Sequence, residues 1–178
     1  MTYAKQKLSI KTQTLAAIGA VAAAVILPQL FHLMGAISGT GTALGETFLP
    51  MHLPIILAGL LAGPYVGAVS GLLAPLLSFM LTGMPSAAML PFMMIELCVY
   101  GLTSGLLRNV KMPTVAKVAI AQISGRGVRA VAILLAVYAF GNNAIPVAII
   151  WNSIAAGVFG IVLQLVFIPL VVYRVKNR

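Results

Sequence analysis

The chain has 178 residues, of which 61% are hydrophobic and only 7% are charged, and its mean hydropathy is +1.10. This composition excludes an ordinary soluble domain, which is about one quarter charged, and the single Cys98 excludes a disulfide scaffold. A polytopic membrane protein remains, in which roughly 20 apolar residues form each helical span.

Apolar runs separated by glycine, proline and basic residues predict an all-α integral membrane protein with six transmembrane helices in one domain, residues 1–178. The stretch between the first two helices, 35–47, is rich in glycine and is expected to form an outer loop flexible enough to act as a lid. In chain order the predicted helices cover about 12–34, 48–62, 65–82, 86–107, 115–140 and 145–173.

The basic residues indicate how this bundle is oriented. Of the 11 Lys and Arg residues, nine lie at the termini or around the loop between the fourth and fifth helices. The loops on the opposite side contain none: 35–47, 83–86 and 141–144. Because Lys and Arg flanking the spans stay on the cytoplasmic side, both termini are predicted to be cytoplasmic. Charges placed at segment ends fit a lipid bilayer as the surroundings and argue against nucleic acid as a partner.

The sequence contains no motif for catalysis, metal binding or nucleotide binding. It lacks Gly-x-Ser-x-Gly, His-Glu-x-x-His, a Cys/His cluster and a phosphate-binding glycine loop that ends in Lys-Ser/Thr. Its only two carboxylates are Glu46 and Glu96. We therefore expect no enzyme activity, no bound metal and no cofactor held by this chain.

Ionisable side chains inside spans are costly, so they normally face the bundle interior or a cavity and mark function. Glu96 lies in the fourth predicted helix, and Gln122, Arg126 and Arg129 share one face of the fifth. Two interpretations of Arg126 remain open: an ion pair with Glu96 that locks the two helices, or a contact with ligand. Arg129 then lacks an obvious acidic partner, which suits an anionic or carbonyl-rich ligand.

Methionine and aromatic residues gather in the outer loops and helix starts, where flexible side chains suit an adaptable binding surface. Either such a surface or ordinary contact with the membrane interface explains them. The polar residues of the spans and the amides near the last outer loop complete the candidate site. The predicted substrate-binding residues are Phe48, Met51, His52, Met84, Met89, Met93, Glu96, Gln122, Arg126, Arg129, Asn142, Asn143 and Asn152.

Small residues also mark one face of the first helix, where Ala16, Ala20 and Ala24 recur at steps of four. Small residues let membrane helices approach closely. Internal packing and docking of an outside partner are both compatible with this pattern.

Several runs resemble the substrate-binding S components of energy-coupling-factor (ECF) vitamin transporters, over about residues 12–173. They are FLPMHLPIILAGLLAGP at 48–64, Gly67-x-x-x-Gly71-x-x-x-Pro75-Leu-Leu-Ser78, Leu81-Thr-Gly-Met-Pro85 and Glu96-Leu-x-x-Tyr100-Gly-x-x-x-Gly105. The resemblance implies a six-helix bundle in the bacterial cell membrane that captures a vitamin from outside. It also implies a membrane T component, docked on the Ala16, Ala20 and Ala24 face, and two cytoplasmic ATPase subunits that hydrolyse ATP, in a module either shared or dedicated.

The helix at 48–64 is more similar to cobalamin-type members than to riboflavin or thiamine members, which implies cobalamin or a related corrinoid precursor as the substrate. Pantothenate is the alternative, with its carboxylate in a charge-assisted pair with Arg126 or Arg129. Two other functions remain open: a self-sufficient secondary carrier with Glu96 as the coupling site, and a non-transport assembly subunit.

Overall fold

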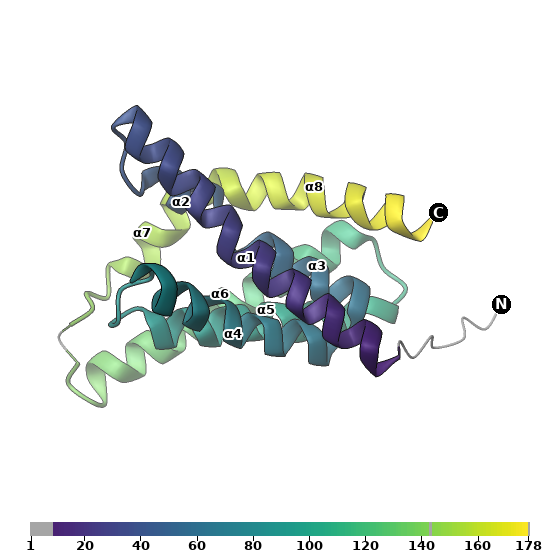
Figure 1. The fold of residues 1–178 in the computed structure, drawn as a ribbon. Coiled ribbons are helices and arrows are strands. Elements are labelled where there is room, and N and C mark those ends of the chain that lie inside the picture. Colours follow the sequence, from purple (N-terminus) through teal and green to yellow (C-terminus); the bar gives the residue numbers. More distant parts are fainter. Residues whose placement is uncertain (1–8, 143, 178) are drawn as a thin grey trace.

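The computed structural model describes residues 9–142 and 144–177, and all the helices and turns in this part of the chain belong to one bundle (Figure 1). Six stretches are long and apolar enough to cross a membrane, which confirms the predicted all-α fold and its six spans. The elements are α1 (Ile10–Ser38), α2 (Ala43–Phe48), α3 (His52–Ala62), α4 (Pro64–Thr82), α5 (Leu90–Leu106), the short 3₁₀ helix η1 (Leu107–Asn109), α6 (Thr114–Tyr138), α7 (Ile149–Ala156) and α8 (Val158–Lys176).

Helix α5 lies at the centre of the bundle and packs against α3, α4 and α6. Helix α1 crosses α3 and α4, while α8 contacts α6 and α3. Figure 1 shows the start of α1, the end of α8 and the loop after α5 at one end of the bundle, with α2 and α7 at the other. The basic residues of the described chain that flank the spans therefore share one end, as the sequence predicts.

Glycines bring α4 and α5 into backbone contact. A Cβ added at Gly67 would overlap the backbone of Gly101, and one added at Gly71 would overlap the backbone at Leu97. At the inner end, Gly105 lies equally close to Pro64. In lipid, the hydrophobic effect does not drive helices together. Van der Waals packing does, and small residues increase it because they let the backbones approach closely. Along this contact, α4 and α5 are consequently packed backbone against backbone.

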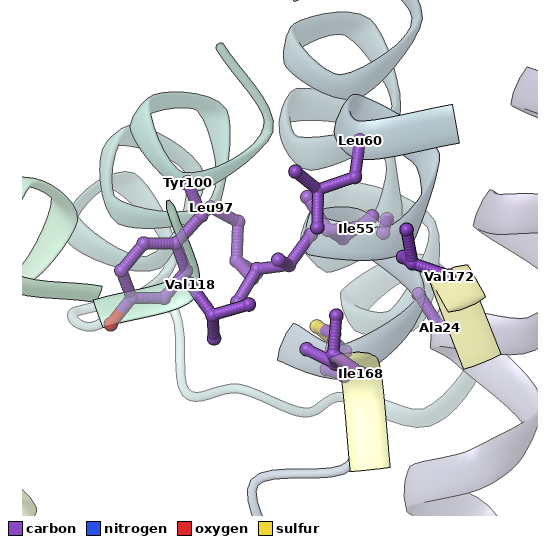
Figure 2. Packing of buried hydrophobic residues seen from close by; sticks show 11 residues of the cluster. Ala24, Ile55, Leu60, Leu97, Tyr100, Val118, Ile168 and Val172 are labelled. Atoms are coloured by element: carbon purple, nitrogen blue, oxygen red, sulfur yellow. The ribbon is translucent and has the colours of Figure 1, made fainter. Parts of the chain in front are cut away.

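The main apolar core joins α1, α3, α4, α5, α6 and α8. Figure 2 shows the side chains of Ile55, Leu97 and Ile168 converging in this cluster. Ala24 lies in the same cluster and is fully buried. The prediction that Ala24 belongs to a docking face is therefore wrong, because its side chain does not reach the surface. Ala16 and Ala20 are half-buried, and their role in docking stays a prediction.

Two predicted segments differ from the structure. The last helix is divided at Gly157 into α7 and α8, rather than continuous over 145–173. The expected loop at 35–47 is largely helical, since α1 continues to Ser38 and α2 follows. Helix α2 is separated from α3 at Leu49, whose φ of 50° is left-handed. Leu49 precedes a proline, and a residue in that position is disfavoured in the right-handed helical region.

Candidate functional site

A cavity of about 580 Å³ lies at the end of the bundle that carries α2 and α7. Its walls come from the second half of α1, from α2, from the start of α3 and α5, from the loop after α4, from the middle of α6, and from α7. This end is opposite the end that carries the basic loop and the C-terminus. By the positive-inside rule, the cavity opens on the outer side of the membrane.

Glu96 is the centre of a buried polar network in the wall of the cavity that faces the interior of the bundle. Its side chain is 1% exposed, and Arg129 Nη1 donates a hydrogen bond of 2.9 Å to Glu96 Oε2. Tyr100, one turn further along α5, donates its hydroxyl to Glu96 Oε1 at 2.7 Å. His52 Nε2 lies 3.9 Å from the same oxygen. The network joins α3, α5 and α6 and compensates the buried carboxylate.

The partner of Glu96 is thus Arg129, so the interpretation that Arg126 forms this ion pair is wrong. Helix α6 approaches α5 closely at Gly125, where a Cβ would overlap the ring of Tyr100. This contact sets the rotation of α6 and brings Arg129 to the carboxylate. Arg126 also lines the cavity, but it forms no ion pair with Glu96.

Arg126 has no acidic partner within the described chain, and its Nε is enclosed without a hydrogen-bond partner. Glu96 neutralises one of the two arginines, so the α6 wall of the cavity carries one uncompensated positive charge. His52 is 6% exposed, and its Nδ1 is likewise buried without a partner. A guanidinium and an imidazole with free hydrogen-bonding capacity therefore border the same cavity.

Nine of the predicted substrate-binding residues line this cavity, and their contact with a ligand stays a prediction. Four of them are methionines, while the polar members come from α3, α5, α6 and α7. The nine are Met51, His52, Met84, Met89, Met93, Glu96, Arg126, Arg129 and Asn152.

Three predicted residues do not line the cavity. Phe48 packs between Phe31 and Phe159, with ring centroids 4.9 and 5.0 Å away, and so joins α2 to α1 and α8. Gln122 is buried and donates to Gln164 Oε1 at 2.9 Å.

Asn142 Oδ1 accepts a hydrogen bond of 2.9 Å from the amide of Ala144, which stabilises the turn after α6. Neither the two amides nor Phe48 is positioned for the predicted contact with substrate, because each is occupied within the fold. Asn143 lies outside the described residues.

The structure also adds polar residues to the cavity that sequence reasoning missed. They come from the end of α1 and α4, from α2, from the loop after α4 and from α7: His32, Thr42, Glu46, Ser78, Ser86 and Ser153. One signal was available for His32, because an ionisable residue in an apolar helix normally faces an interior. Glu46 lies in the segment predicted as a loop, and only the formation of α2 brings its carboxylate to the cavity.

The bundle defines a multi-pass membrane protein with a cavity at one end, lined by both polar and apolar residues. The model of the family "ECF transporter, substrate-specific component" matches residues 11–172. The chain therefore belongs to the substrate-specific components of ECF transporters, the subunits that bind substrate and work with T and ATPase modules. No curated protein and no solved structure matches the chain.

Proposed function

We propose that this substrate-specific component takes up a small, water-soluble vitamin with an anionic group from outside the bacterial cell membrane. One observation carries the proposal: the Arg126 guanidinium borders the outer cavity without an acidic partner in the described chain. Arg126 is half-buried, and a positive charge removed from water without compensation is costly. An anionic ligand supplies that compensation, so pairing with the positive charge of Arg126 contributes to the ligand's affinity.

Arginine suits this task because its planar guanidinium binds a carboxylate or phosphate through two parallel hydrogen bonds. Arg129 is already held by Glu96 at 2.9 Å, which leaves Arg126 as the contact for the anion. His52, which borders the same cavity, has a further hydrogen-bonding atom without a partner in the described chain, Nδ1. The methionines then surround the apolar part of the ligand.

The size of the cavity favours pantothenate or a vitamin of similar size over cobalamin. Pockets for small ligands enclose most of the ligand surface. A volume of about 580 Å³ lies in the usual range of pockets for small ligands, which favours a small vitamin over a much larger corrinoid. We therefore replace the corrinoid expectation with a small anionic vitamin of the pantothenate type.

Transport then depends on partner subunits. The sequence has no phosphate-binding loop for ATP, so we propose that a membrane T component and two cytoplasmic ATPase subunits supply the energy. A self-sufficient carrier that couples transport to protons at Glu96 is disfavoured, because Arg129 and Tyr100 both bind that carboxylate.

The direct test is to purify the protein from its native membrane and identify the bound small molecule by mass and absorbance. The proposal expects a colourless anionic vitamin at one molecule per chain, and transport into vesicles only with the T and ATPase subunits present. A coloured corrinoid, a neutral ligand, or full uptake by this chain alone would contradict it.

A further inference from the structure

The wall of the cavity opposite α6 carries polar groups of a different kind. Glu46 on α2 lines the cavity, and it forms no ion pair with any basic residue of the described chain. Its side chain is exposed and open to the cavity, and among the described residues its carboxylate accepts one hydrogen bond, from the Thr42 hydroxyl at 3.3 Å. A carboxylate has about four acceptor sites, so most of the acceptor capacity of Glu46 is unused by side chains of the protein.

His32 on α1 lies beside this carboxylate-bearing helix. A Cβ added at Gly45 would lie 3.0 Å from His32 Cε1, so the ring lies directly against α2. His32 also lines the cavity, and its enclosed Nδ1 has no hydrogen-bond partner. A buried polar atom normally has a partner, which points to a group that this chain does not supply.

This wall is fixed in position rather than loosely attached. Phe48, at the end of α2, is held between Phe31 and Phe159. At Gly160 the backbone of α8 lies so close to α2 that an added Cβ would be 2.7 Å from the backbone of Phe48. The carboxylate of Glu46 and the guanidinium of Arg126 therefore stay on separate elements and do not neutralise each other.

We propose that the cavity binds a bipolar ligand, with its anionic group at Arg126 and a hydroxyl or amino group at Glu46 and His32. Glu46 accepts the hydrogen bond of that donor group, and the methionines cover the apolar section in between. The inference rests on the proposed function, because it presupposes an anionic group at Arg126. It adds the requirement that the other end of the ligand bears hydrogen-bond donors.

Three probes separate the two poles. Pantothenate has a carboxylate at one end and hydroxyls at the other. Panthenol has the hydroxyls but a neutral alcohol in place of the carboxylate, and N-(3,3-dimethylbutanoyl)-β-alanine has the carboxylate but neither hydroxyl. Binding to the purified full chain is measured by calorimetry for the wild type, for Glu46→Gln and for Thr47→Ser, a matched control on α2 whose residue does not line the cavity.

The inference expects pantothenate to bind wild type and Thr47→Ser equally. It expects removal of the hydroxyls, or Glu46→Gln, to weaken binding about tenfold each. The two changes together should cost little more than either alone, because both remove the same interaction.

Equal affinity for pantothenate and its hydroxyl-free analogue overturns the bipolar ligand and leaves the anion site at Arg126 intact. Panthenol binding as tightly as pantothenate overturns the proposed function itself, and with it the inference. Binding of none of the three probes at millimolar concentration also overturns both.

Discussion

The two halves of this bundle use their residues in opposite ways. In the inner half, Gly67, Gly101 and Gly105 bring α4 and α5 into backbone contact. In the outer half, the helices diverge around a cavity of about 580 Å³ that is bordered by Arg126 and His52, both with unpaired polar atoms. The difference shows that close helix packing and the cavity lie at different depths along the membrane normal. The packed half fixes the helices, and the open half retains unmet polar groups for a ligand.

The largest effect is expected in the packed half, from Gly67→Leu. A side chain at this position overlaps the backbone of Gly101, and backbone cannot move aside as a flexible side chain can. Overpacking of a well-packed core costs about 1–3 kcal/mol, occasionally more, and here α4 must separate from α5.

We expect loss of folded protein for Gly67→Leu, measured as monodisperse yield in detergent and as thermal unfolding. Gly127→Leu is the matched control, because nothing lies within 4 Å of an added Cβ there. If both variants fold equally well, close α4–α5 packing is not what stabilises the inner half.

The buried carboxylate at the border of the two halves gives the next effect. Glu96→Gln removes the charge that compensates Arg129, and breaking a buried pair costs roughly 3–5 kcal/mol. We expect a lower unfolding temperature while binding of an anionic ligand persists, since the α6 wall becomes more positive.

Glu46→Gln serves as the control for stability, because Glu46 is exposed and forms no ion pair in the described chain. Unchanged stability of Glu96→Gln would show that the network around Glu96 is not a structural element. Loss of a proton-coupled flux in that variant would instead favour a secondary carrier.

A smaller effect separates two alanines of α1. Ala24 is fully buried in the core, whereas Ala20 is half-buried. Ala24→Leu is expected to lower thermal stability of the isolated chain by about 1–3 kcal/mol. Ala20→Leu is expected to leave stability and ligand binding unchanged and to reduce co-purification with the T component, because bulk prevents close approach. Normal assembly of the Ala20→Leu protein would place the docking face elsewhere.

Much of this architecture follows from the sequence by simple physical rules. Six spans follow from apolar length, and the shared end of the termini and the α5–α6 connection follows from the basic residues. The cavity positions of His52, Glu96 and Arg126 follow from the cost of exposing ionisable groups to lipid. These rules depend on composition and position along a helix, so no knowledge of helix contacts is required.

The pairing of Glu96 was beyond such rules. Arg126 and Arg129 share one face of α6, and the choice between them depends on how α6 rotates against Tyr100 at Gly125. The position of Phe48 depends in the same way on the close approach of α2 to Gly160. Periodicity identifies a face of a helix, whereas the crossing of two helices decides which residue on that face makes the contact.

The central claim is that the unpartnered guanidinium of Arg126 selects an anionic ligand, and one calorimetric comparison tests it directly. Wild type, Arg126→Ala and Arg126→Lys are each titrated with pantothenate and with panthenol. We expect Arg126→Ala to weaken pantothenate about thirtyfold. Arg126 is half-buried, and this loss is the lower end of the roughly 2–5 kcal/mol that losing one partner of a buried charge pair costs. Arg126→Lys should retain part of the affinity, and panthenol should bind weakly to all three proteins. Undiminished binding of pantothenate to a folded Arg126→Ala protein would contradict the account.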